Sequence, residues 1–228
     1  MYSSDNNNLH NVEIPAKQIL DLIESLGDDK LTAFFKQMDY PEEEKILYLY
    51  KQFHITPKYD KDGKLLPVSE TDQLAAVNKY GGVLQYIQNP SEKVQIAAVK
   101  NHGHAIEYIK NPSEKVQLAA VNKNGPAIYF IIDKGIIPSE DVQLAAVNEN
   151  GNAIYNIPNP SEKVQLAAVN KDGLAIYYII KNGIVPSEKV QLAAVNEDSY
   201  AFSCIIDKGI IPSEKVKQLA REKGIKDV

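Results

Sequence analysis

The sequence predicts an all-α protein: a right-handed α-solenoid of about six two-helix repeats of 22–26 residues with a helical N-terminal cap. Three observations predict this fold: a recurring motif, a glycine at a fixed distance after it, and apolar residues at helical spacing. The motif PSEKVQLAAVN occupies 112–122, 160–170 and 186–196, with near copies starting at Pro90 and Pro138. Self-similarity with a period of about 20–50 residues is typical of stacked repeats.

A glutamine that every copy keeps gives the period. Its successive spacings are 22, 22, 26, 22 and 26 residues. The glutamines are Gln73, Gln95, Gln117, Gln143, Gln165 and Gln191. We therefore expect six repeats over residues 67–211 and a C-terminal half-repeat at 212–228 that closes the array.

The first helix of each repeat is expected to begin at a serine. Ser113, for example, follows Pro112 and precedes an apolar run, as N-cap serines do. Asn111 could instead cap a helix with Pro112 in its first turn. The longer repeats have Ile or Val before the proline, so the serine cap fits all copies better. Apolar residues nearly all round this short helix predict that it is buried.

A column of glycines marks the expected end of the first helix. These are Gly81, Gly103, Gly125, Gly151 and Gly173. Glycine just past a helix accepts the left-handed conformation at little cost, and this is the role we expect here. Ser199 breaks the column and predicts a more strained turn.

The second helix follows, with sequences such as AIYFII and AIYYII. In the longer copies it is expected to end at Gly135, Gly183 and Gly209, four residues adding about one helical turn. Pro158 should stop it early in the fourth repeat.

The pattern V-x-L-A-A-V-x-x-x-G-x-A-[IL]-x-[YF] resembles the short tandem helical repeats of an uncharacterised bacterial and viral family, loosely similar to HEAT and armadillo solenoids. The resemblance covers about residues 67–216. It implies a helical-repeat architecture and brings no activity, cofactor or catalytic residue.

Residues 12–66 precede the repeats and are expected to form helices that cap the array, after a disordered tail at 1–11. A separate effector or dimerisation module is the alternative. The string DKDG at 60–63 suggests a calcium loop, but Lys58 and Ser69 stand where carboxylates are required. A polar turn is the better interpretation.

Composition limits the function classes. The net charge is −5 and Arg221 is the only arginine, so the chain lacks the basic footprint of a nucleic-acid-binding protein. A single cysteine, Cys204, excludes an internal disulfide and favours a cytoplasmic setting. No apolar run approaches the roughly 18 residues of a membrane span, and the N-terminus does not resemble a secretory signal.

Neither the histidines nor the cysteine predict chemistry. His102 and His104 flank Gly103, but no neighbouring Cys or acid completes a zinc set. Cys204 belongs to an aromatic column that we expect to pack inward, and no base accompanies it. With no phosphate loop either, we expect a protein that is not an enzyme and needs no cofactor.

Three columns are candidates for binding or packing. Tyr129, Tyr155 and Tyr177 either form an exposed ridge or pack across the groove between repeats; the sequence favours neither. Asn122, Asn148 and Asn170 share a column that also accepts lysine, which indicates a solvated position. The glutamine column predicts an amide ladder, or bonds to the end carbonyls of the adjacent helix, that tie each repeat to the next; contact with a ligand is the less favoured alternative.

These features together predict a non-catalytic binding protein, a scaffold or inhibitor that engages a partner protein on an extended surface through these tyrosines and asparagines. The alternatives are nucleic-acid recognition, one repeat at a time, and small-molecule capture in the solenoid groove. The sequence does not indicate an oligomeric state.

Overall fold

The computed structural model describes residues 68–225, and every regular element there is a helix, which confirms the helical-repeat solenoid. The expected tail at 1–11, the cap at 12–66, the turn at 60–63 and the last residues of the half-repeat lie outside the described residues. The right-handedness stays a prediction. Contacts divide the chain into two units, whose described parts are 68–76 with 86–89, and 77–85 with 90–225.

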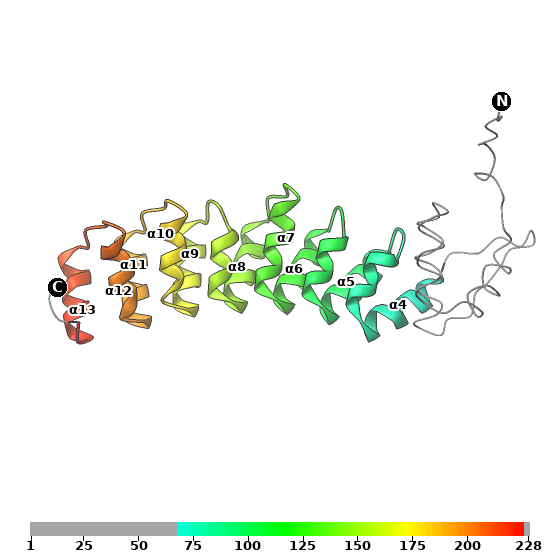
Figure 1. Cartoon of the computed structure of the whole chain (residues 1–228), viewed down its shortest axis with the longest axis horizontal. Helices are drawn as coiled ribbons and strands as arrows, with labels where there is room; N and C mark the ends of the chain where they lie inside the picture. The colour runs from blue at the N-terminus through cyan, green and yellow to red at the C-terminus, as the bar shows by residue number, and fades with distance from the viewer. Residues whose placement is uncertain (1–67, 226–228) are drawn as a thin grey trace, which may run out of the picture. The chain divides into compact units, whose positions relative to one another are not determined.

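The helices alternate along the chain as predicted. The first helices are α4 (Glu70–Lys79), α5 (Glu92–Asn101), α6 (Glu114–Lys123), α8 (Glu140–Glu149), α9 (Glu162–Lys171), α11 (Glu188–Glu197) and α13 (Glu214–Glu222). The second helices are η1 (Gly81–Tyr86), η2 (Gly103–Tyr108), η3 (Gly125–Ala127) with α7 (Ile128–Asp133), η4 (Gly151–Asn156), α10 (Ala175–Lys181) and α12 (Tyr200–Asp207). From α5 to α13, each first helix packs beside the next in a row (Figure 1).

Repeat length decides the type of the second helix. The 22-residue repeats carry the 3₁₀ helices η1, η2 and η4, whereas the longer repeats carry the α-helices α7, α10 and α12. As predicted, the longer helices end at glycines with φ of +75°, +82° and +77°, namely Gly135, Gly183 and Gly209. The η4 helix ends two residues before Pro158, but η1 and η2 end at the equivalent residue without a proline, so the early stop is not specific to Pro158.

The serine caps are confirmed. Each cap serine is extended, and its hydroxyl accepts a hydrogen bond from the valine N–H three residues later, at 3.4 Å for Ser161 and Val164. The caps are Ser91, Ser113, Ser139, Ser161, Ser187 and Ser213. The alternative asparagine cap does not occur at these helices.

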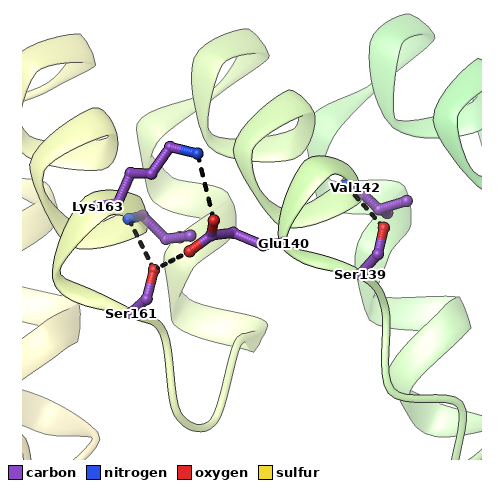
Figure 2. A network of polar contacts seen from close by, with 6 residues as sticks. Ser139, Glu140, Val142, Ser161 and Lys163 are labelled. Atoms are coloured by element: carbon purple, nitrogen blue, oxygen red, sulfur yellow. Dashed lines mark hydrogen bonds and ion pairs between the residues drawn. The ribbon is translucent and has the colours of Figure 1, made fainter.

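The same hydroxyls join successive repeats. Ser161 Oγ donates to Glu140 Oε1 at 2.5 Å, and Lys163 Nζ lies 3.2 Å from Glu140 Oε2 (Figure 2). The equivalent pairs are Ser113–Glu92, Ser139–Glu114, Ser187–Glu162 and Ser213–Glu188. Because each serine both caps its own helix and binds the preceding one, these pairs form a serine–glutamate ladder along the first helices.

The glycine column has a different role from the one expected, because none of its members has a positive φ. A Cβ at Gly151 would lie 2.8 Å from the carbonyl oxygen of Ala168, and one at Gly173 would lie 2.7 Å from that of Ala194. The same clash, below 3.0 Å, meets each of the other three glycines. Glycine is therefore required because the next repeat's first helix approaches the backbone closely.

The strained turn predicted at Ser199 is wrong. Ser199 has φ −61° and ψ −28°, an ordinary right-handed helical conformation. The first helix of the next repeat, α13, is followed by the left-handed Gly224, and the Ile225 N–H donates to the Ala220 carbonyl at 3.0 Å. The C-terminal end of α13 thus differs in conformation from that of the other first helices. The close approach of an alanine carbonyl, which requires glycine in the other repeats, is not repeated at Ser199.

The core lies between the two helix layers, and the first helices are buried on one side only. In α5, Val94, Ala98 and Val99 are fully buried, whereas Ile96 and Ala97 are half-exposed. The prediction of burial nearly all round is therefore wrong, because the outer face of this layer meets solvent. That face carries a half-exposed apolar strip from repeat to repeat.

We expect Gly151→Ala to destabilise the chain by about 1–3 kcal/mol, the usual cost of forcing a methyl group into a packed contact. Urea denaturation of the full chain measures this effect. Asn152→Ala, at the neighbouring exposed position, is the matched control and should change little. Equal midpoints for the two variants would contradict the role assigned to the glycine column.

The ladder also predicts acid sensitivity. The Ser161 hydrogen bond, then Lys163, holds the pKa of Glu140 below its ordinary 4.5, and Ser213 and Lys215 do the same for the pKa of Glu188. A carboxylate with a lowered folded-state pKa stabilises the fold above its ordinary pKa, and this contribution is lost as pH falls through the folded-state value.

The melting temperature should therefore fall as pH drops from about 6 to about 3, and the drop should be smaller in Glu140→Gln, whose side chain does not titrate. Calorimetry across this range measures it. An unchanged pH profile in Glu140→Gln would show that this ladder contact contributes nothing to acid sensitivity.

Candidate functional site

Tyr129, Tyr155 and Tyr177 stand on the surface of three successive repeats, and we call them the tyrosine ridge. Their exposed fractions are 48%, 47% and 36%. They come from α7, η4 and α10, so the ridge crosses the boundary between long and short repeats. The sequence left open whether these tyrosines are exposed or pack across the groove between repeats. In the structure all three are partly exposed to solvent.

The ridge rings are nevertheless held by other rings. Tyr129 packs edge to face against Phe130, and Tyr177 against Tyr178, with centroids 5.3 Å apart in both pairs. Tyr178 also contacts Tyr155 of the preceding repeat at 5.4 Å. Among the described residues no ring contact joins two ridge members directly. The ridge is exposed on one side and anchored on the other, in part across a repeat boundary.

Two lysines lie over the C-terminal part of the ridge. Lys181 Nζ is 5.0 Å from the Tyr155 ring centroid and 6.0 Å from that of Tyr177, and Lys208 Nζ is 5.5 Å from that of Tyr177. An ammonium at such distances is attracted to the electron-rich ring face. These contacts place two cations beside exposed aromatic surface.

The N-terminal part of the ridge has a different electrostatic character. The Tyr129 hydroxyl donates to Asp133 Oδ1 at 3.5 Å. Lys134 is turned away, with Nζ donating to the Phe130 carbonyl at 3.1 Å and to the Ile106 carbonyl at 3.4 Å. Partial burial lowers the pKa of Lys134.

The predicted asparagines lie on the other helix layer. Asn122, Asn148 and Asn170 are exposed on α6, α8 and α9. Two of them line a groove of about 690 Å³ over α8, α9 and α11. Its lining residues are Leu144, Asn148, Glu162, Lys163, Leu166, Ala167, Asn170, Lys171 and Lys189. The groove thus combines an apolar floor with amides and ammonium groups.

The six predicted residues therefore form two sets. Asn148 and Asn170 both line the groove, whose lining includes neither Asn122 nor any ridge tyrosine. The sequence analysis missed Lys181 and the half-exposed leucines of the groove. Lys181 stands where the other long repeats have aspartate, and that departure from the pattern was the available signal. The leucines were not recognised as surface residues because the first helices were expected to be buried on nearly all sides.

The glutamine column does not join repeats. Each side chain folds back on its own repeat, where Nε2 donates to the carbonyl five residues earlier, as from Gln165 to Pro160 at 3.0 Å. The other pairs are Gln73–Val68, Gln95–Pro90, Gln117–Pro112, Gln143–Pro138 and Gln191–Pro186. That carbonyl precedes the helix and has no partner within it, so the amide satisfies it locally.

The aromatic column that contains Cys204 does not pack inward as expected. Tyr108 is exposed, and Phe130, Tyr178 and Cys204 are half-buried beside the ridge. Burial, then the carboxylates of Asp207 and Asp198, raises the pKa of the Cys204 thiol. A raised pKa lowers the thiolate fraction and makes this cysteine a poor nucleophile.

The histidines pack among other rings. His102 and His104 lie edge to face with centroids 5.6 Å apart, and His104 Nε2 is 2.6 Å from Asn124 Nδ2. Over residues 68–225, no group of three or more His, Cys, Asp or Glu side chains is placed to hold a metal ion.

No helix between residues 68 and 225 has the length and apolar character needed to cross a membrane. Comparison with protein-family models, with curated proteins and with solved structures finds no match. The family resemblance of the repeat pattern therefore stays a prediction, and any function must be argued from the two surfaces.

We expect Cys204 to react slowly with iodoacetamide at about pH 7.5, since its pKa lies above the ordinary 9.0. The comparison is a Cys204→Ser, Asn152→Cys variant, which presents its thiol at an exposed turn. Mass spectrometry of the two time courses should show the turn thiol alkylated first. Equal rates would contradict the effect of burial at Cys204.

Proposed function

We propose that this protein is a non-catalytic binding protein whose repeats engage a partner protein on an extended surface. The tyrosine ridge supports the proposal most strongly, because Tyr129, Tyr155 and Tyr177 present three partly exposed rings from three consecutive repeats. Tyrosine is enriched at protein interfaces, where it combines a large apolar area with a hydroxyl group. The single cysteine is consistent with a cytoplasmic setting for this interaction.

The packing of the ridge favours binding energetically. The contacts with Phe130 and Tyr178 restrict the tyrosine side chains before any partner arrives. Immobilising a flexible side chain at an interface costs about 0.5–1.5 kcal/mol, and a side chain that is already restricted avoids part of that cost. A stacked row of repeats also keeps the rings in register over a long span.

The groove supports a second candidate, the capture of a small anionic molecule. Lys163, Lys171 and Lys189 face it together with Asn148 and Asn170. Lys163 is already paired with Glu140, and Glu162 also lines the groove, so its positive charge is partly neutralised. Nucleic-acid recognition is less favoured, because the net charge is −5 and the chain has one arginine.

The test of the first proposal is a pull-down with three baits: the wild type, a Tyr129→Ala, Tyr155→Ala, Tyr177→Ala variant, and a control. The control is Ile137→Ala, Val185→Ala, Ile211→Ala, which removes three apolar side chains that are 91%, 74% and 88% exposed in the loops of the same protein. Circular dichroism first establishes that all baits keep their helices.

We expect a protein partner to be retained by the wild type and the loop control and to be lost from the ridge variant. Truncating a central tyrosine at an interface often costs about 2 kcal/mol or more. Equal capture by all three baits would remove the ridge as the binding surface. Recovery of nucleic acid in place of protein would overturn the proposed partner class.

A further inference from the structure

Lys181 and Lys208 are cations without an internal counter-ion. Within the part of the chain that the structure describes, neither ammonium has a carboxylate at ion-pair distance, and each is held only by tyrosine rings. Lys163 and Lys215 instead pair with Glu140 and Glu188, both at 3.2 Å. Other exposed lysines of the described chain, such as Lys93 and Lys115, also have no carboxylate at ion-pair distance, so the position over tyrosine rings is what distinguishes Lys181 and Lys208.

These two lysines lie beside ridge tyrosines that are partly exposed to solvent, at 47% for Tyr155 and 36% for Tyr177. Lys181 lies between the faces of Tyr155 and Tyr177, and Lys208 lies over Tyr177 from the next repeat. The phenol hydroxyls of the two tyrosines add hydrogen-bond donors beside the ammonium groups. Asp207, the residue before Lys208 in the chain, is also exposed and offsets one of the two positive charges, which leaves one net positive charge among these three groups.

The other end of the ridge is acidic. Glu107 is exposed in the column that holds Tyr129, and Asp133 accepts the hydrogen bond of the Tyr129 hydroxyl. Lys134 interacts with both carboxylates and offsets one of the two negative charges, although its ammonium donates to the Phe130 and Ile106 carbonyls. The net formal charge of the groups beside the ridge is therefore negative at Tyr129 and positive at Tyr155 and Tyr177, and complementary charge steers and orients a partner.

We infer that the partner segment is acidic where it crosses Tyr155 and Tyr177, with Asp or Glu carboxylates accepting hydrogen bonds from Lys181, Lys208 and the phenol hydroxyls. This inference rests on the proposed function, since it names the chemistry of the partner at the same ridge. Hydrogen bonds between ammonium and carboxylate are stronger than neutral ones. The acidic end repels carboxylates, so the acidic part of the partner lies over the last two tyrosines and away from Tyr129.

The direct test uses a decaglutamate peptide as the probe and the full chain labelled with ¹⁵N-tyrosine. At low ionic strength, titration should shift the amide signals of Tyr155 and Tyr177 but not that of Tyr129, and decalysine should not reproduce this pattern. The shifts should weaken as salt rises, because screening shortens the Debye length from about 30 Å to about 8 Å at physiological ionic strength.

The Lys181→Gln, Lys208→Gln variant should bind decaglutamate about threefold or more weakly, as expected for two exposed ion pairs. Lys93→Gln, Lys115→Gln removes the same charge from two exposed positions of α5 and α6, outside both the ridge and the groove, and is the matched control, which should bind like the wild type. Unchanged binding in the first variant, or equal loss in both, would overturn the inference. Tighter binding of single-stranded oligothymidylate at the same tyrosines would overturn it in favour of nucleic acid.

The pull-down separates this inference from the proposed function. If the ridge variant loses the partner but Lys181→Gln, Lys208→Gln retains it fully, the ridge binds and the acidic partner is wrong. If the ridge variant also retains the partner, the proposed function itself fails at this surface.

Discussion

The structure depends on how closely one repeat approaches the next. At the end of each first helix up to the fifth repeat, a glycine lies so near the next repeat's alanine carbonyl that no Cβ fits between them. The serine–glutamate ladder, as in Ser161 and Glu140, binds the opposite ends of the same helices. With a contact at each end, neighbouring first helices are fixed in separation and in tilt. Both contacts recur because the eleven-residue motif, which holds the serine, the glutamate and the alanine, recurs together with the glycine three residues after it.

This fixed stacking explains why changes in the second helix do not disturb the row. A second helix that is longer by about one turn, or a 3₁₀ helix, can follow the glycine, since the contacts that set the spacing lie in the first layer. The second layer is thereby free to vary, and Tyr155 on the 3₁₀ helix η4 is still exposed to nearly the same extent as Tyr129 on the α-helix α7, at 47% and 48%. A conserved spacing in one layer supports a variable surface on the other.

The sequence predicted the parts of the fold that local chemistry controls. Serine caps and the left-handed ends at Gly135, Gly183 and Gly209 depend on residues within a few positions, so their signals are direct. The glycine column and the glutamines were misinterpreted because their partners lie on other elements: a neighbouring carbonyl for Gly151, a preceding loop for Gln165. For the same reason, the sequence could not decide whether the tyrosines are exposed, since their exposure depends on which side chains of the adjacent repeat pack against them.

A strictly periodic surface has a weakness as a binding site, because a partner that fits one repeat fits the next equally well and can slip along the row. Specificity requires a difference in affinity between registers, and only residues that break the period can supply it. On the ridge, Lys181 is such a residue: the corresponding position is aspartate in the other two long repeats, at Asp133 and Asp207. A segment with carboxylates at one end would be attracted at the fifth repeat and repelled at the third. The repeats provide the length of the surface, and their departures from the consensus determine where along it a partner binds.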